Sequence, residues 1–428
     1  MQIQSIQPYS IQTNNKIQNI AHNNHSVQLN HEQNNAQSVY ATNVYGINFG
    51  AKKEYNSSFE KEISQQANVL NKLSNEYFSE RGKVNMDLNI TPKEMKNIKH
   101  ITIIASGSSK NAGEMAAGFI EKATKVPVNV VSASEYMFKE PQANKKDDLA
   151  IVISQSGGTA DTLAALNTLK DKNVKTIAIT NKEGSKIADA ADSHIYIQAG
   201  KENAVAATKT VTSSIYSLMA VGLKLGEIKG SVDKTEINRY ALEFKTLPRK
   251  INRMLEDTAD VKKAADVISN SENIYYYAKG SNTGAVREGA LKLTETTGKR
   301  VIADSSSEAL HGTFASIKPE NPVLQIAVGD INSQSYETSI ANINEMTRKR
   351  HIKNPIIIKS SWDNEIQDKI DSDNAIFINI PHAREEFTPI LATVRFQQIT
   401  NEVTKNLGID PDNGGGFLTK YRQNMDMK

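Results

Sequence analysis

Three ionisable residues lie at helical spacing within one short segment. Glu288, Lys292 and Glu295 are separated by four and three positions, which places them on one stripe of a helix. A carboxylate beside an ammonium group can act as a base steered by the cation. The same spacing is typical of a solvated Glu–Lys–Glu ladder, and composition alone favours that interpretation. The adjacent stripe is apolar and places the charged side at the edge of the core: Val286, Ala290 and Leu293.

Two turns rich in serine and glycine could hold an anion. Glycine lets the backbone approach a ligand, and hydroxyl groups beside the free N–H groups at a helix start form a socket for a phosphate. The motif GxxxxGK[ST] is absent, so a single phosphate fits better than a nucleoside triphosphate. Helix capping by serine and threonine is the alternative, but two such turns in one sheet favour the phosphate. The turns are Ser106-Gly107-Ser108-Ser109 and Ser154-Gln155-Ser156-Gly157-Gly158-Thr159.

One histidine stands apart from these groups. His311 lies in the segment Ser307-Glu308-Ala309-Leu310-His311-Gly312. A lone histidine is more often structural than catalytic, but one that titrates near neutrality can also move a proton on a sugar ring oxygen.

The segments around the first two turns predict a parallel sheet. Short apolar runs at 100–105, 127–132, 149–153, 176–180 and 194–198 alternate with helical segments, the last of which is expected at 208–225. This alternation predicts a sheet covered by helices on both faces. Because ligands bind beyond the carboxyl ends of such strands, both turns are expected at the binding edge.

The same pattern repeats in the second half. Strands are expected at 273–278, 300–303, 322–328, 355–359 and 375–380, with helices at 331–350 and 389–406. Two similar units predict a tandem duplication. The predicted organisation is an arm at 1–56, a helical entry segment at 57–98, a first unit at 99–230, a helical connector at 231–271, a second unit at 272–407 and a tail at 408–428.

Composition excludes several classes of protein. The 428 residues are enough for about three domains. Cysteine is absent, which excludes disulfides, thiolate metal sites and cysteine nucleophiles. Because 51 basic residues face 48 acidic ones, no nucleic-acid partner is expected. No apolar run approaches the ~20 residues of a membrane helix and no secretory signal is visible, so we expect a cytoplasmic protein without a membrane partner.

The first fifty residues differ from the rest. They contain eighteen Asn or Gln but only two charged residues, Lys16 and Glu32. Such a tract buries too little apolar surface to offset its ordering entropy, so we expect disorder. Its three histidines are not expected to hold a metal, because a disordered tract offers little preorganisation: His22, His25 and His31.

Six segments together resemble a known family. They are ASGSS (105–109), SASEY (132–136), ISQSGGTADTLAAL (153–166), AGKENAVAATKT (199–210), EGALKLTE (288–295) and EALHG (308–312). In order and spacing they resemble the tandem sugar-isomerase (SIS) domains that form the isomerase half of glutamine–fructose-6-phosphate aminotransferases. The resemblance covers roughly residues 57–428. It implies an α/β fold of two SIS domains, each a mostly parallel, doubly wound, flavodoxin-like sheet.

The resemblance also implies roles for individual residues. Glu295 resembles the acid/base that moves a proton between C1 and C2, and Glu288 and Lys292 match supporting positions. His311 resembles a ring-opening histidine supplied by the neighbouring subunit, which implies a homodimer with a shared site. Lys420 resembles the lysine that forms a Schiff base with the open-chain ketose. The implied ligands of the sugar phosphate are Ser106, Gly107, Ser108, Ser109, Ser154, Gln155, Ser156, Thr159, Val205 and Thr419.

Departures from the family pattern bear on the reaction. The synthases of this family hydrolyse glutamine with a cysteine, which is absent here, and Gly158 replaces an acidic residue in the second turn. We therefore expect an isomerase or deaminase of glucosamine 6-phosphate, fructose 6-phosphate or a close hexose 6-phosphate, without metal or organic cofactor. The alternatives are an ammonia-dependent synthase, a deglycase of a sugar-amine phosphate, and a non-catalytic sugar-phosphate sensor.

Overall fold

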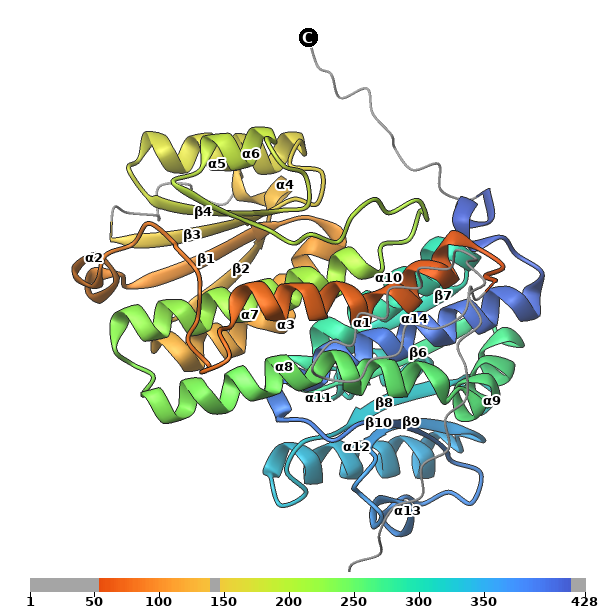
Figure 1. Cartoon of the computed structure of the whole chain (residues 1–428). Helices are drawn as coiled ribbons and strands as arrows, with labels where there is room; N and C mark the ends of the chain where they lie inside the picture. Colours follow the sequence, from red (N-terminus) through yellow and green to blue (C-terminus); the bar gives the residue numbers. More distant parts are fainter. Residues whose placement is uncertain (1–53, 139–146, 417–428) are drawn as a thin grey trace, which may run out of the picture. The chain divides into compact units, whose positions relative to one another are not determined.

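The computed structural model describes residues 54–138 and 147–416. The predicted arm, apart from its last three residues, therefore lies outside the described residues, as do Thr419 and Lys420. The described residues form two five-stranded parallel sheets flanked by helices, which confirms the predicted α/β class (Figure 1). Within these residues, no helix is long and apolar enough to span a bilayer.

Both sheets have the same topology. The first has the order β2-β1-β3-β4-β5 and the second the order β10-β9-β8-β6-β7. Read from the other edge, the second order is β7-β6-β8-β9-β10. When the strands are numbered within each unit, both sheets therefore have the order 2-1-3-4-5, as the predicted duplication and doubly wound fold require. The strands of the first sheet are β1 (His100–Ala105), β2 (Val128–Ser132), β3 (Asp148–Ile153), β4 (Lys175–Thr180) and β5 (Ser193–Tyr196). Those of the second are β6 (Asn273–Ala278), β7 (Arg300–Ser305), β8 (Val323–Ala327), β9 (Pro355–Ser360) and β10 (Ile376–Ile380).

Helices cover both faces of each sheet. Figure 1 shows α3 and α7 on one face of the first sheet and α5 and α6 on the other, and α10 and α14 opposite α12 in the second unit. The first unit contains α3 (Gly107–Thr124), α4 (Ala133–Tyr136), α5 (Ala160–Asp171), α6 (Lys186–Ala190) and α7 (Lys209–Lys229). The second contains α10 (Asn282–Thr297), α11 (Ser306–Ala309), α12 (Gln334–Arg350), α13 (Ile366–Lys369) and α14 (Thr388–Leu407).

Successive side chains of a strand pack into two different cores. In β3, Leu149, Ile151 and Ile153 pack into the core that the two units share, whereas Ala150 and Val152 pack against α5 on the outer face. This division follows from the period of two, which sends successive side chains to opposite faces. Within the shared core α3 contacts both α7 and α10, so the helices that follow β1 and β6 lie against each other.

The remaining helices brace the two units. The entry helix α1 (Ser58–Tyr77) packs on α7, α8 and α14, and α2 (Pro92–Asn97) precedes β1. The connector consists of two helices, α8 (Lys234–Glu256) and α9 (Ala259–Ser269). The described residues also include the short 3₁₀ segments η2 (Thr313–Ser316), η3 (Glu385–Phe387) and η4 (Pro411–Gly416).

Some element ends differ from the prediction, and capping explains two of them. Helix α7 continues past the predicted end at 225, because its left-handed cap is Gly230 with φ +76°. Helix α12 begins at Gln334 instead of 331, because the Ser333 side chain accepts a hydrogen bond from the Tyr336 N–H. Strand β5 ends at Tyr196, two residues before the predicted end.

Candidate active site

The charged stripe of α10 is buried. The side chain of Glu288 is 0% exposed and that of Lys292 only 1%, whereas Glu295 remains 21% exposed. The Lys292 Nζ lies 3.5 Å from Glu288 Oε1 and 2.5 Å from Glu295 Oε2. The solvated-ladder interpretation, which composition favoured, is therefore wrong. A buried lysine needs compensating charge, and this stripe provides two carboxylates for one ammonium.

Lys292 keeps its charge in this environment. Burial by itself lowers the pKa of a lysine, but the attraction of Glu288 and Glu295 exceeds that effect and raises the pKa of Lys292 above its ordinary value. The side chain is thus a fixed cation at neutral pH. It can stabilise negative charge on a ligand, but it cannot serve as a base.

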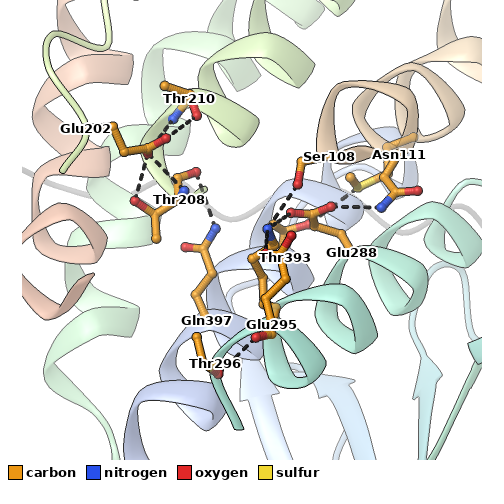
Figure 2. Close-up of polar contacts among 12 residues, drawn as sticks. Ser108, Asn111, Glu202, Thr208, Thr210, Glu288, Glu295, Thr296, Thr393 and Gln397 are labelled. Carbon is orange, nitrogen blue, oxygen red and sulfur yellow. Dashed lines mark hydrogen bonds and ion pairs between the residues drawn. The ribbon is translucent and has the colours of Figure 1, made fainter. Parts of the chain in front are cut away.

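The first unit contributes directly to this cluster. Asn111 Nδ2 donates to Glu288 Oε2 at 2.8 Å, and Lys292 Nζ donates to Ser108 Oγ at 3.0 Å. Figure 2 shows Ser108 and Asn111 of α3 facing Glu288 of α10. The close approach of these helices depends on Gly284, where a Cβ would come within 2.7 Å of the Met115 side chain and 3.1 Å of the Asn111 carbonyl.

A cavity of about 130 Å³ adjoins Ser108. Its walls come from the turn after β1, the turn after β3 and the segment leading into α7. Among the predicted ligands of the sugar phosphate, five line it: Ser106, Ser108, Ser109, Gln155 and Val205. Gly107, with φ +54°, lies between two of these serines in the left-handed conformation that favours glycine. The remaining lining residues are Glu202, Ala207, Thr210, Val211 and Ser214.

Helix capping does not account for the hydroxyl groups at the two turns. Ser106 and Thr159 occupy the N-cap positions of α3 and α5, but neither side chain forms a capping hydrogen bond. The Oγ of Ser106 is buried and has no hydrogen-bond partner among the described residues. A buried hydroxyl without a partner is costly unless a ligand or water satisfies it. Ser106 is thus available to a ligand in the cavity.

The turn after β3 uses most of its hydroxyl groups internally. Ser154 Oγ lies 2.8 Å from Thr159 Oγ1 and accepts a hydrogen bond from the Gly157 N–H at 3.1 Å. Ser156 Oγ accepts from the Gly158 N–H at 3.3 Å. These contacts shape the turn. Among the residues of the turn, Gln155 lines the cavity. Ser154, Ser156 and Thr159 therefore support the cavity without lining it in this structure.

Sequence reasoning missed Glu202. Its Oε1 accepts from the Thr208 N–H and Oγ1 at 2.9 and 3.0 Å, and its Oε2 accepts from Thr210 Oγ1 at 2.6 Å. Figure 2 shows this group across from Ser108 and Glu288, and its charge contributes to the raised pKa of Lys292. The only sequence signal was its place three residues before Val205 in the segment AGKENAVAATKT.

One predicted residue that the structure describes, His311, is not brought to the cluster. His311 is exposed, and its side chain forms no hydrogen bond or ion pair with any described residue. Lys420 lies outside the described residues. The described chain nevertheless ends close to the cavity, because the Val205 N–H donates to the Asp412 carbonyl at 3.3 Å. The Asp412 carboxylate in turn accepts from the Ser58 and Phe59 N–H groups at the start of α1.

The described residues contain no cluster of three or more His, Asp or Glu side chains that could hold a metal ion. The three histidines of the predicted arm lie outside them.

Comparison with known proteins gives the family. The model of the SIS domain matches residues 94–224 and again 267–396. An isomerizing glutamine–fructose-6-phosphate aminotransferase of Clostridium acetobutylicum is 33% identical over 326 residues, which are 76% of this chain and 52% of that protein. A homologue from Caldanaerobacter subterraneus is 31% identical over 82% of this chain and 56% of its own length. The chain thus spans about half the length of these relatives.

Solved structures agree with this assignment. The C-terminal domain of glucosamine-fructose-6-phosphate aminotransferase from Francisella tularensis superposes with a TM-score of 0.77 at 27% identity, covering 85% of this chain and 99% of that one. A tagatose-6-phosphate ketose/aldose isomerase from Escherichia coli shares the fold, with a TM-score of 0.69, 18% identity and coverage of 83% and 95%. Two SIS-domain matches on two sheets of identical strand order place the chain in the SIS-domain family, as a tandem pair of phosphosugar isomerase-type domains related to the isomerase half of these aminotransferases.

Proposed function

We propose that this chain is an enzyme that isomerises or deaminates glucosamine 6-phosphate, fructose 6-phosphate or a close hexose 6-phosphate. One observation carries the proposal: a buried ammonium, Lys292, connects a partly exposed carboxylate, Glu295, to the hydroxyl-lined cavity at Ser108. Moving a proton between adjacent carbons needs a base near both carbons and a positive charge for the developing oxyanion. The cavity would hold the phosphate and so position those carbons.

The chemistry balances without an oxidant. In the open-chain form of glucosamine 6-phosphate, Glu295 removes the C2 proton and returns it to C1. The C1 aldehyde oxygen gains a proton, so C1 becomes a hydroxymethyl group, and the amine on C2 loses one N–H proton, so C2 becomes an imine. Water then hydrolyses the imine to fructose 6-phosphate and ammonia. Because the 428 residues contain no cysteine, they offer no cysteine-dependent hydrolysis of glutamine as a nitrogen source.

We also propose that His311 acts from a second copy of the chain, in line with the homodimer that the resemblance implies. Its exposure, and the absence of a polar partner among the described residues, support this role. Sedimentation of the full chain, with and without fructose 6-phosphate, tests the dimer. A His311→Ala variant that dimerises but loses turnover of the ring form would support the role, and a strictly monomeric active protein would contradict it.

The activity is tested with a panel of substrates. The full chain is incubated with glucosamine 6-phosphate, fructose 6-phosphate plus ammonia, tagatose 6-phosphate and a fructosyl-amino-acid 6-phosphate, and ammonia and sugar products are measured. Turnover of glucosamine 6-phosphate with equal release of ammonia and fructose 6-phosphate supports a deaminase. Turnover of another compound of the panel would assign that compound as the substrate and keep the chain in the isomerase class. Tight binding of hexose 6-phosphates without turnover of any member would identify a sugar-phosphate sensor.

A further inference from the structure

A second cavity, of about 360 Å³, lies at the carboxyl ends of β9 and β10. It shares no lining residue with the candidate active site. The carboxyl-terminal edge of an open parallel sheet is where ligands of such folds bind. The turns after β9 and β10 form one wall, and the end of α8 together with α14 forms the other.

An exposed aromatic platform forms part of this cavity. Trp362 is the only tryptophan of the chain and is 74% exposed. Its ring stacks on His382, with centroids 4.1 Å apart and planes 2° apart, so the indole is held flat. A large aromatic ring that stays in water but is held in one orientation is well suited to stacking on a planar ligand.

The opposite wall is cationic. Arg249 and Arg253 are exposed and lie four positions apart on α8, where like charges repel. Neither side chain forms an ion pair or hydrogen bond with any residue that the structure describes. Lys250 also lines the cavity but is neutralised by Glu243 at 2.7 Å. The two arginines thus leave an uncompensated charge at the cavity mouth.

A buried guanidinium lies behind them. Arg395 is 2% exposed and lines the cavity. Its Nε and Nη1 donate to the carbonyls of Met254, Asp257 and Asn379 and to Gln398 Oε1. Its Nη2 donates to none of the described residues. Burial lowers the pKa of Arg395 to about 10, although the charges of Asp257 and Asp260 oppose the shift. An anion in the cavity would supply a partner for this group.

We propose that this cavity binds a nucleoside phosphate. The base stacks on Trp362, and the phosphate meets Arg249, Arg253 and Arg395. Asp257 lines the cavity and offers a carboxylate acceptor to the ribose hydroxyl groups. Inorganic phosphate would satisfy the arginines alone and a free nucleoside would satisfy the platform alone, whereas a nucleoside phosphate satisfies both. The site is separate from the proposed sugar-phosphate chemistry, so each hypothesis is tested independently.

The single tryptophan makes the test direct. Fluorescence of the full chain, excited at a wavelength where nucleotides do not absorb, reports on Trp362 and on no other tryptophan. ADP and UDP are the probes, and adenosine, ribose 5-phosphate and fructose 6-phosphate are the partial ligands. We expect saturable quenching by at least one nucleotide, with at least about tenfold weaker binding of each partial ligand. Equal binding of ribose 5-phosphate, or no saturable response to either nucleotide, would overturn the proposal.

Variants separate this site from general charge effects. The double variant Arg249→Gln/Arg253→Gln is expected to weaken nucleotide binding by about tenfold or more while the tryptophan spectrum of the free protein stays unchanged. Arg239→Gln is the matched control, because Arg239 is exposed on the same helix but pairs with Glu236 and does not line the cavity. Calorimetry of Trp362→Phe is expected to show weakened nucleotide binding. An equal loss in Arg239→Gln would reject the assignment to this cavity.

Discussion

The side-chain amide of Asn111 donates a hydrogen bond to Glu288 Oε2 at 2.8 Å, although the two residues lie 177 positions apart. Each stands on the helix that follows the first strand of its unit, α3 or α10. The bond therefore joins the helix that follows the first serine- and glycine-rich turn to the charged stripe of the second unit. It also satisfies one oxygen of a carboxylate that has no exposure to solvent.

Removing Lys292 should destabilise the fold strongly. A Lys292→Met variant leaves Glu288 buried without its counter-ion, which typically costs about 3–5 kcal/mol. The double variant Lys292→Met/Glu288→Gln should recover part of this loss, because the fully buried carboxylate is then neutral and only the partly exposed Glu295 loses its partner. Urea denaturation measures both, with the exposed Lys93→Met as the control. A cost below about 1 kcal/mol for the single variant would mean that the pair is solvated after all.

Replacing Glu295 should separate turnover from binding. Glu295→Gln keeps the shape of the side chain but removes the proposed base, so we expect kcat to fall by about 10²–10⁴ while hexose 6-phosphate affinity changes little. Steady-state kinetics with calorimetry measures the two quantities. Glu272→Gln, whose native carboxylate is 88% exposed, is the matched control and should retain full activity. Full activity of Glu295→Gln would exclude Glu295 as the base.

The neighbouring glycines of the second turn should respond differently to alanine. A Cβ on Gly157, which has φ +64°, would lie 2.1 Å from Ser185 Oγ, whereas a Cβ on Gly158 meets nothing within 4 Å. Gly157→Ala should therefore cost about 1–3 kcal/mol of stability and weaken phosphate binding. Gly158→Ala should leave both nearly unchanged. Thermal unfolding and calorimetry compare them, and equal effects would contradict the described geometry of the turn.

Ser106 should matter for binding but not for folding. Its buried Oγ has no partner among the described residues, so Ser106→Ala should leave the free energy of unfolding unchanged or slightly raised. A hydrogen bond to a charged phosphate contributes about 1.5–3 kcal/mol, so hexose 6-phosphate affinity should fall by about tenfold or more. Ser154→Ala should instead reduce stability, because Ser154 Oγ holds Gly157 and Thr159. Unchanged affinity in Ser106→Ala would remove Ser106 from the binding site.

Glu62 should give the stability a pH dependence. Burial raises the pKa of Glu62, and the hydrogen bond from the Asn203 N–H only partly opposes the shift. The folded state thus holds the proton more tightly than the unfolded state. The contribution of the Glu62 carboxyl group to the free energy of unfolding is fully present below its ordinary pKa of 4.5. It is lost as pH rises through the pKa of the folded state. The stability of the native protein relative to Glu62→Gln should therefore decline as pH rises above 4.5. A constant difference in urea unfolding would contradict this.

The pattern of residues along the chain is sufficient to predict the architecture. Alternating β-branched strands and amphipathic helices can bury their apolar faces only in a parallel sheet covered on both sides, so the strands and the duplication were predictable from pattern. The two serine- and glycine-rich turns could be located as well, because parallel strands bring their carboxyl ends to one edge. Local capping chemistry, such as Ser333 at α12, decided element ends that periodicity could not.

The environment of the charged residues depends on how the helices pack. Composition favoured an exposed ladder for Glu288 and Lys292, because helical spacing says nothing about what covers a helix face. The contact of α3 with α10 buries them and brings Ser108 to Lys292. Glu202 joined the site for the same reason, since the field at Lys292 depends on distance in space and not along the chain. Burial and electrostatic interactions depend on how helices and strands pack together. They therefore determine which residues form the candidate site.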